Sequence, residues 1–215
     1  MDKKKTSKGK KIPKATIIRL PVYLHYLTEL AQKGISVVPS HDLAELAGGN
    51  GPQLRKDLSY LGEFGTRGVG YNVGRLAHHI SKFMGLNKEQ SVAIIGVGKL
   101  GMALINYKGF AEKGFKICAG FDNNSQMIGK KVDDLVIYDV RDLGKIIKEK
   151  DIEICIITVA ASEAQSIADK LISCGIKAIL NFAPIFLKVP DDVVACQIDL
   201  SIELQILSFY RTLLK

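Results

Sequence analysis

Ten residues at 92–101, VAIIGVGKLG, have the types and the spacing of a site for a dinucleotide. The apolar residues indicate a strand, and Gly96, Gly98 and Gly101 follow it in the order of a tight strand-to-helix turn. The first glycine permits the turn, the second lets the backbone approach a pyrophosphate, and the third lets helix and strand pack closely. The helix N-terminus then favours the phosphate charge. The residues expected to contact the cofactor are Gly96, Val97, Gly98, Lys99, Leu100 and Gly101.

An acidic residue at the end of the next expected strand supports the same interpretation. Asp122 lies 21 residues beyond Gly101, where a carboxylate can hold the adenosine ribose hydroxyls. This carboxylate would repel a 2′-phosphate, and Asn123 and Asn124 supply no compensating cation. NAD(H) is therefore the expected cofactor rather than NADP(H). A nucleotide-like fold whose site is empty or repurposed is the alternative.

Positive charge is concentrated in the first part of the chain. The net charge is +8, yet residues 1–80 hold 13 Lys/Arg and 6 Asp/Glu, whereas residues 81–215 hold 17 and 16. Residues 1–12 include six lysines and few apolar side chains, which is typical of a disordered basic tail. The asymmetry predicts a polyanion-binding module joined to a nearly neutral one. A basic face that merely aids solubility is the alternative.

The basic part has the pattern of a helix-turn-helix. A first helix is expected to end at Gly34, with a kink or a fresh start at Pro21. Ser40 is a plausible N-cap for a short helix through Ala47, and Pro52 suits the first position of the next helix. The residues expected on the buried faces of the first and last of these helices are Ile17, Leu20, Leu24, Leu27, Leu30, Leu54, Leu58 and Leu61.

The helix after Pro52 and the segment that follows it present groups suited to double-stranded DNA. Residues 64–73, FGTRGVGYNV, predict a short hairpin with a glycine-rich tip, the wing of a winged helix. A thin basic tip fits a narrow A/T-rich minor groove, while Arg, Lys and Gln on a helix suit base edges and Ser and Tyr suit phosphates. The candidate DNA contacts are Gln53, Arg55, Lys56, Ser59, Tyr60, Arg67, Gly68 and Tyr71.

Beyond residue 91 the pattern changes to strands that alternate with helices. Near-continuous apolar strands such as ICIITV predict a parallel, Rossmann-like sheet buried on both faces, so the chain is expected to be of the α/β class. Helices are expected at 73–86, 141–149 and 162–174. The candidate strands are 91–96, 115–121, 135–138, 153–159, 177–182 and 194–199.

The last segment, residues 201–215, is apolar on most sides, which is unusual for a helix exposed to water. We expect it to pack into a partner subunit, and packing on its own domain is the alternative. The expected divisions of the chain are a basic tail 1–12, a winged-helix domain 13–86, a Rossmann domain 87–199 and a dimerisation helix 200–215.

Cysteine usage and hydropathy indicate the cytoplasm. The four cysteines form no CxxC pair and are interpreted as reduced core thiols, with a metal site or a redox switch as the alternatives. No apolar run approaches the ~18 residues of a membrane helix, and the lysine-rich start is unlike a secretory signal. The histidines, including the adjacent His78 and His79, are interpreted as surface or packing residues, so no metal site is expected.

No enzyme activity is expected from this arrangement. The chain has no histidine after residue 80, and no room for a substrate domain follows the last strands. A cofactor domain fused to a DNA-binding module fits a sensor, for which the cofactor is the signal. A small NAD-dependent oxidoreductase with a basic module is the main alternative. A sensor of CoA or an acyl nucleotide is another, against which Asp122 argues.

Taken together, these segments make the sequence resemble the Rex family of redox-sensing transcriptional repressors over nearly its whole length. The resemblance implies a homodimer that binds palindromic A/T-rich operators of genes for respiration or fermentation. It further implies that NADH releases the DNA, that NAD⁺ permits or favours binding, and that the last helix crosses into the partner subunit. The matching segments are LRKDLSYLGEFGTRGVGYNVGRL (54–76), GVGKLGMAL (96–104), YKGF (107–110), NFAP (181–184) and the region of Asp199.

The resemblance also gives roles to residues outside the glycine turn. Thr158 and Asn181 match loops near the cofactor. Tyr107 and Asp199 match residues that rearrange when the reduced nicotinamide enters. These four positions are therefore expected to belong to the cofactor site or to its switch.

Two positions depart from the family pattern. Lys99 stands inside the glycine motif where some members carry Arg. His25 stands where some members carry an Arg that pairs with the switch aspartate. A titratable His25 would make the switch pH-sensitive or would use another partner.

Overall fold

A computed structural model of the chain describes residues 12–66 and 68–214. The expected basic tail, apart from its last residue, and the candidate DNA contact Arg67 lie outside the described residues. The chain divides into two compact units, Met1–Asn87 and Lys88–Lys215, each of which has its own apolar core.

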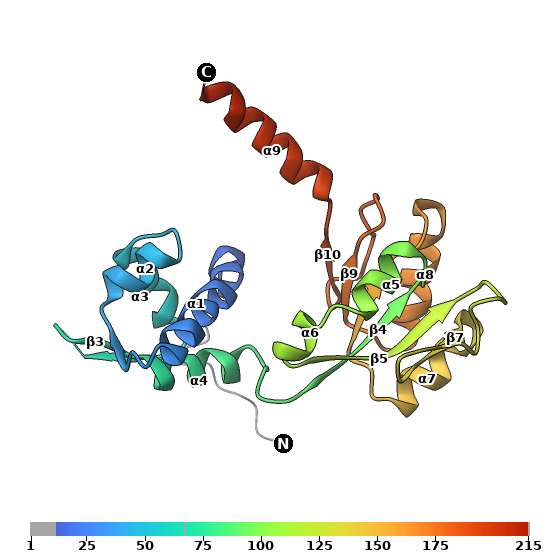
Figure 1. Ribbon diagram of the computed structural model, residues 1–215, viewed down its shortest axis with the longest axis horizontal. Coiled ribbons are helices and arrows are strands. Elements are labelled where there is room, and N and C mark those ends of the chain that lie inside the picture. The colour runs from blue at the N-terminus through green and yellow to red at the C-terminus, as the bar shows by residue number, and fades with distance from the viewer. Residues whose placement is uncertain (1–11, 67, 215) are drawn as a thin grey trace. The chain divides into compact units, whose positions relative to one another are not determined.

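The first unit is a small helical domain with a three-stranded antiparallel sheet (Figure 1). Its helices are α1 (Lys14–Gln32), α2 (Ser40–Leu46), α3 (Gly51–Ser59) and α4 (Val73–Phe83). Its strands, in the spatial order β1-β3-β2, are β1 (Val37–Val38), β2 (Gly65–Thr66) and β3 (Gly70–Asn72). The expected hairpin is therefore present as β2 and β3, and β1 is a third strand that the sequence pattern did not reveal.

Helix α1 differs from expectation in two respects. Pro21 lies inside one continuous helix, so no fresh start occurs there. The buried face also includes Thr16 and Tyr23, whereas Ile17 is 53% exposed. The helix ends as expected, because Gly34 takes a φ of +75° and the amides after Lys33 bond back to the last carbonyls.

The start of each helix in the helix-turn-helix is shifted from the expected residue. Pro39, not Ser40, is the N-cap of α2, and the Ser40 hydroxyl instead accepts a hydrogen bond from Arg55. Asn50 caps α3, since its side chain accepts from the amide of Gln53, and Pro52 is the second residue of the helix rather than the first. Ser40 is therefore not the N-cap of α2, and Pro52 is not the first residue of α3, as the sequence pattern had predicted.

The second unit contains a seven-stranded sheet in the order β10-β9-β8-β4-β5-β7-β6. Neighbouring strands run parallel except β6, which pairs antiparallel with β7 and was not expected. The strands are β4 (Gln90–Ile95), β5 (Phe115–Asp122), β6 (Lys131–Val132), β7 (Leu135–Asp139), β8 (Ile154–Ile157), β9 (Ala178–Asn181) and β10 (Val194–Gln197).

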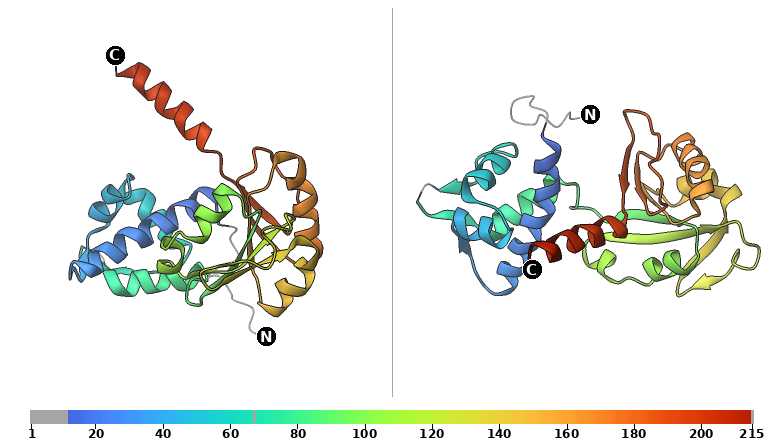
Figure 2. Two further views of the ribbon diagram at one scale, coloured as in Figure 1. Left: turned by 45° about the vertical axis from the view of Figure 1, so that its right-hand side comes forward. Right: turned by 90° about the horizontal axis from the view of Figure 1, so that it is seen from above.

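Helices cover both faces of this sheet, as Figure 2 shows. One face carries α7 and α8, and the other carries α5 and α6, so the expected Rossmann-like architecture is confirmed. Their bounds, with the short 3-10 turn η1, are α5 (Lys99–Ile105), α6 (Gly109–Glu112), η1 (Val140–Asp142), α7 (Leu143–Glu149) and α8 (Ala161–Ser173).

The last helix, α9 (Leu200–Leu213), buries none of its residues in this chain. Its large apolar side chains are all exposed, among them Leu204 and Phe209 at 67% and 61%. Packing of this helix on its own domain is therefore ruled out in the described structure, which leaves its apolar surface for another partner.

All four cysteines are free, but they are not all core thiols as expected. Cys155 is fully buried in the sheet, where burial holds the pKa of its thiol well above the usual range. Cys118 and Cys174 are half-buried, and Cys196 is exposed on β10 because its side chain falls on the uncovered side of the edge strand.

Candidate nucleotide site and nucleic-acid interface

The glycine turn after β4 has the geometry that the sequence indicated. Gly96 takes a φ of +93°, and a Cβ at this position would lie 2.8 Å from the Val159 side chain and 2.9 Å from the Thr158 carbonyl oxygen. A Cβ on Gly101 would overlap the carbonyl oxygen of Gly96. Both positions therefore require glycine, one for its backbone conformation and the other for the contact between helix and strand.

Gly98 is different, because a Cβ on it would meet no protein atom within 4 Å. It is the N-cap of α5, so the open space lies at the amino end of that helix. Lys99 and Leu100 are exposed in the first turn, whereas Val97 is buried. Free space beside a helix terminus is what a pyrophosphate needs, and these residues fit that group.

Asp122 ends β5 and holds the turn with main-chain hydrogen bonds. Its Oδ2 accepts from the Val97 amide at 2.7 Å, and its Oδ1 accepts from the Asn124 amide at 2.8 Å. Thr158, just after β8, donates its hydroxyl to the Gly96 carbonyl at 2.6 Å. Both side chains thus fix the glycine turn, and a carboxylate has further lone pairs with which to accept from ribose hydroxyls.

These groups surround a cavity of about 200 Å³ at the carboxyl ends of β4, β5 and β8. The chain order reverses between β4 and β8, and such a point is where open α/β sheets bind ligands. The cavity is lined by Gly96, Gly98, Asp122, Asn123, Val140, Thr158, Val159, Ala160, Glu163 and Ile167.

Asn181 is not among the residues that the fold gathers around this cavity. Its side chain is 1% exposed and donates to the Ile185 carbonyl at 2.8 Å and to Gln197 Oε1 at 2.7 Å. Its own Oδ1 accepts from the Ala183 amide at 3.0 Å. The amide is thus occupied in fixing the loop after β9, and its contact with a cofactor stays a prediction.

The sequence interpretation missed a pair of charged residues at the end of β7. Asp139 is the register partner of Asp122 on the neighbouring strand. Its carboxylate accepts from Arg141 Nε at 2.9 Å and from Nη2 at 2.5 Å. Val140, which lies between the two in sequence, lines the cavity, whereas Asp139 and Arg141 themselves do not.

The candidate DNA-binding residues of α3 present one exposed face. Arg55, Lys56 and Ser59 are exposed, and Tyr60 is half-buried. Arg55 Nη1 donates to the Ser40 hydroxyl at 2.9 Å, which tethers the guanidinium to the start of α2.

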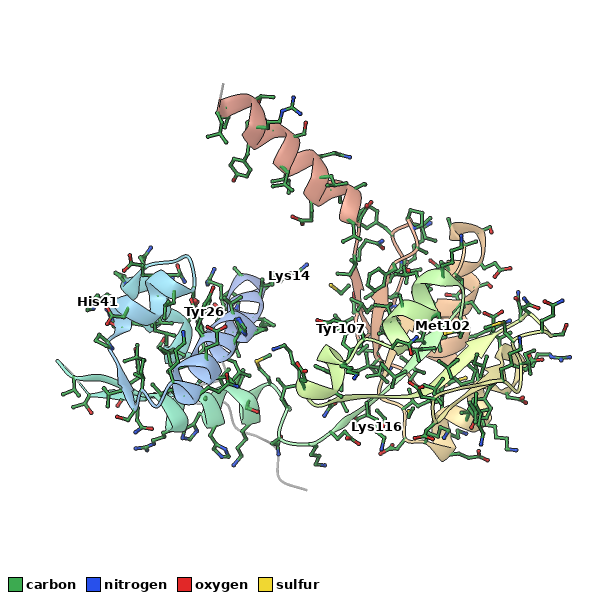
Figure 3. The ribbon with its side chains drawn as sticks, in the orientation of Figure 1. Lys14, Tyr26, His41, Met102, Tyr107 and Lys116 are labelled. Carbon is green, nitrogen blue, oxygen red and sulfur yellow. The ribbon has the colours of Figure 1, made fainter. Side chains whose placement is uncertain are left out.

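A groove of about 740 Å³ lies between α3 and the β2–β3 hairpin. Arg55 and Ser59 line one side of it, and Gly68 and Tyr71 line the other. His41, labelled in Figure 3, lies on α2 at the same groove and is 77% exposed. The structure thus brings Arg55, Ser59 and Gly68 to one surface. Tyr71, by contrast, is only 7% exposed and packs in the apolar core of this unit, so its expected contact with DNA stays a prediction.

Asp57 is the main residue of this unit that the sequence interpretation missed. It is fully buried, and its carboxylate accepts hydrogen bonds from Arg19 at 2.6 Å and 2.8 Å, from Thr16 at 2.8 Å and from Tyr23 at 2.8 Å. Gln53 Nε2 also donates to it at 3.0 Å, so this candidate DNA contact is only half-exposed. Three side chains of α1 therefore tie it to α3 through one carboxylate, and Gln53 of α3 completes the set of donors.

The electrostatics of this network follow from its hydrogen bonds. Burial alone would raise the pKa of Asp57, but the donors around it, of which Arg19 is the strongest, lower it to about 2. Burial and the same carboxylate raise the pKa of Tyr23 to about 12. The spacing of Leu54, Asp57 and Leu58 on one helix face was the available signal, because it places an acidic residue within the buried stripe.

The three candidate switch residues occupy separate local settings. Tyr107 is 58% exposed beside α6 and stacks edge-on against Phe110 at 5.1 Å, as Figure 3 locates it. Asp199 is the N-cap of α9, and hydrogen bonds from Ser201 hold the pKa of its carboxyl below the usual range. His25 Nε2 lies 3.2 Å from Glu29 on the same helix. Their joint role in a switch stays a prediction.

Each unit matches a known family in sequence. Residues 11–59 match the family described as a putative DNA-binding protein N-terminus. Residues 87–185 match the family described as a CoA binding domain. The two matches follow each other along the chain in the same order as the two units.

Curated relatives match the chain over nearly its whole length. The redox-sensing transcriptional repressor Rex of Carboxydothermus hydrogenoformans is 48% identical over 202 residues, which are 94% of this chain and 97% of the relative. The repressor of the same name from Desulfitobacterium hafniense is 51% identical over 199 residues, 93% of this chain and 95% of the relative. The chain belongs to the Rex family.

Solved structures of a Rex-family repressor called RSP share the fold of this chain. The structure of RSP itself has a TM-score of 0.86 at 39% identity and covers 94% of each chain. RSP in complex with NAD⁺ and operator DNA gives 0.88 at 40% identity, covering 94% of this chain and 93% of that one. RSP in complex with NADH gives 0.84 at 38%, covering 94% of each.

The described residues contain neither a helix suited to span a membrane nor a cluster of metal ligands. No helix between residues 12 and 214, residue 67 apart, is both long and apolar enough to cross a membrane. Within the same residues, no three His, Cys, Asp or Glu side chains gather as metal ligands would.

Proposed function

We propose that this protein is a redox-sensing transcriptional repressor, which binds operator DNA and is released from it by NADH. One observation carries the proposal: a chain close to half identical to Rex repressors folds into a basic winged-helix unit and a unit with a glycine-turn nucleotide cavity. The RSP complexes with operator DNA and with NADH support both ligands for this chain. The family favours this function over the oxidoreductase alternative.

The residue roles follow from the two surfaces. Arg55, Lys56, Ser59 and Tyr60 would contact the DNA from α3, and the hairpin would enter a minor groove. The glycine turn would hold the pyrophosphate, and Asp122 would accept from the adenosine ribose. A palindromic, A/T-rich operator is the expected target, because a symmetric dimer presents two equivalent helices and two hairpins.

The homodimer is supported by α9. Its exposed apolar side chains need cover, and a second copy of the same helix offers a self-complementary surface. We propose that α9 inserts into the partner subunit. The cytoplasm is the compartment that we infer, because a repressor must reach operator DNA.

Release requires that NADH bind one conformation of the dimer better than the other. A 100-fold loss of DNA affinity corresponds to about 2.7 kcal/mol of coupling. An apolar closed site that excludes the charged nicotinamide of NAD⁺ and admits the neutral reduced ring would supply such a difference. NADH and NAD⁺ should therefore differ in their effect on operator affinity.

The deciding experiment is fluorescence anisotropy of the full-length protein on a labelled A/T-rich palindromic duplex. NADH should lower the anisotropy at concentrations at which NAD⁺ does not. Equal effects of the two nucleotides would contradict redox sensing. Release by CoA instead would favour the alternative ligand class, and NADH turnover with a carbonyl compound would favour an enzyme.

Two variants test the residue roles in the same assay. Lys56→Ala should weaken operator binding while leaving NADH binding intact, because the side chain is exposed on α3 and far in sequence from the cavity. Lys82→Ala, an exposed lysine near the end of α4, is the matched control for the loss of one positive charge in the same unit. Equal losses of operator affinity in both variants would contradict a specific role for α3.

A further inference from the structure

An arginine, Arg141, follows directly after Val140 of the cavity lining and is paired with the carboxylate of Asp139. Asp139 and Asp122 are register partners on adjacent parallel strands, which lie about 4.8 Å apart, and paired positions point to the same face. Arg141 follows two residues later, and its side chain is 87% exposed, whereas that of Asp139 is 12% exposed. The exposed guanidinium is thus held by a carboxylate that is nearly buried.

The contact uses one edge of the guanidinium. Nε and Nη2 of Arg141 both donate to Asp139 Oδ2, and the Arg141 amide donates to Oδ1 at 2.8 Å. Arginine can also use this pair of N–H groups, Nε and Nη2, to bind two phosphate oxygens in a bidentate manner. The pKa of Asp139 lies below its usual range because Arg141 donates to it, so the carboxylate stays charged and the pair stays formed near neutral pH.

The position matters for the choice between two nucleotides. In Rossmann folds, the carboxylate at the end of the second strand accepts from the ribose 2′-hydroxyl, and an arginine near it accommodates the 2′-phosphate of NADP(H). Here the carboxylate is Asp122, and the arginine comes from the end of the next strand along the sheet, β7. A carboxylate of the NAD(H) type and an arginine of the type that serves NADP(H) therefore follow neighbouring strands of the sheet, but Asp139 neutralises the charge of the arginine.

We propose that Asp139 is a second specificity-determining residue of the nucleotide site, which withholds Arg141 from a 2′-phosphate and so maintains the preference for NADH. The inference rests on the proposed nucleotide site and extends it. Rejection of NADPH then comes from two carboxylates: Asp122 repels the phosphate directly, and Asp139 occupies the cation that would attract it.

The test compares NADH and NADPH affinities of the full-length protein by the change in nucleotide fluorescence on binding. Asp139→Asn is the main variant, because asparagine can still accept from the Arg141 amide and cap the 3-10 turn, while it releases the guanidinium. The ratio of NADPH to NADH affinity should rise about tenfold, the value of one charge-assisted hydrogen bond. It should rise further when Asp122→Asn is added.

The matched variant is Arg141→Ala. Added to Asp139→Asn, it should return the ratio to that of the native protein. Made alone, it should shift the ratio further against NADPH, because it leaves the Asp139 carboxylate unpaired on the strand next to Asp122. An unchanged melting temperature of Asp139→Asn identifies the change as one of recognition rather than folding.

The outcomes separate this inference from the proposed function. One outcome is that the native protein binds NADH while Asp139→Asn leaves the ratio of NADPH to NADH affinity unchanged, in both the native and the Asp122→Asn backgrounds. That result would refute the role of Asp139 and leave the proposed NADH-sensing function intact. A gain of NADPH affinity that survives Arg141→Ala refutes it as well. If the native protein binds neither nucleotide, the proposed function itself fails.

Discussion

The first unit fixes its candidate DNA-binding helix through side chains, whereas the second fixes its nucleotide turn through the backbone. In the winged-helix unit, four side chains converge on the buried carboxylate of Asp57. In the Rossmann-like unit, Gly96 and Gly101 approach each other so closely that no side chain fits between them. Asp122 and Thr158 then bond to the main chain of the same turn.

The two ways of holding a functional element differ in the substitutions that they tolerate. A turn held by backbone conformation fails when a Cβ is added, even that of a small, uncharged alanine. A helix held by a buried carboxylate fails when the charge or one donor is lost, because a buried ion without partners is costly. The two surfaces should therefore be separable by mutation.

The largest effect is expected from Gly101→Ala. The new Cβ would overlap the Gly96 carbonyl oxygen, so the turn must open and NADH binding should be lost. Operator binding should persist and no longer respond to NADH, as anisotropy with and without the nucleotide would show. Gly74→Ala is the control, since a Cβ there has room on α4. Retained NADH binding in Gly101→Ala would contradict the packing argument.

Asp57→Ala should destabilise the winged-helix unit and leave the Rossmann-like unit intact. Loss of the carboxylate leaves Arg19 and Tyr23 without their shared partner, at a cost of about 3–5 kcal/mol in the free energy of unfolding. Operator binding should be lost while NADH binding remains, measured by anisotropy and nucleotide fluorescence after denaturant unfolding has ranked the stabilities. Asp42→Ala, an exposed acidic residue on α2, serves as the control. A variant with native stability would show that the network is dispensable.

Low pH should destabilise the native state through the same carboxylate, that of Asp57. Because its folded pKa of about 2 lies below its unfolded value of about 3.9, Asp57 stabilises the native state above pH 4. This contribution is lost as the pH falls from about 4 towards 2. Melting curves of the native protein and of Asp57→Asn should converge over this interval. Parallel curves would mean that another group governs the acid response of this unit.

The smallest effect is expected from Thr158→Val. The substitution removes the hydroxyl that donates to the Gly96 carbonyl but keeps the shape of the side chain. Loss of one such bond is worth about 1 kcal/mol, so NADH affinity should fall about fivefold. Thr158→Ser, which keeps the hydroxyl, should restore it. Equal affinities for the valine and serine variants would exclude the hydroxyl from the positioning of the turn.

The nucleotide turn could be predicted from sequence because its determinants are local. Gly96, Gly98 and Gly101 lie within six residues, and their conformation and contacts follow from the absence of side chains. Asp122 ends its strand as expected, since the apolar run stops there. The parallel direction of neighbouring strands follows from the alternation of strands and helices, apart from the short edge strand β6, whereas the order of the strands was not predicted.

The DNA-binding unit was less predictable because its determinants are distant in sequence. Thr16 and Tyr23 reach Asp57 across 41 and 34 residues, and no local pattern specifies such partners. The same holds for Asn181, whose partner Gln197 lies on the next strand. Ser40 was assigned to the wrong role for a related reason, since its hydroxyl bonds to Arg55 on another helix.

The β2–β3 hairpin should tolerate no amino-acid replacement at Gly70. It takes a φ of +109°, and a Cβ at this position would overlap the Val38 carbonyl oxygen of the adjoining strand. Every amino-acid replacement at this codon adds a Cβ, so each should spoil the wing while sparing the nucleotide unit. In a dimer, one such subunit would impair its normal partner on a palindrome. Replacements of Gly70 should therefore appear as dominant alleles in a selection for constitutive expression of the regulated genes.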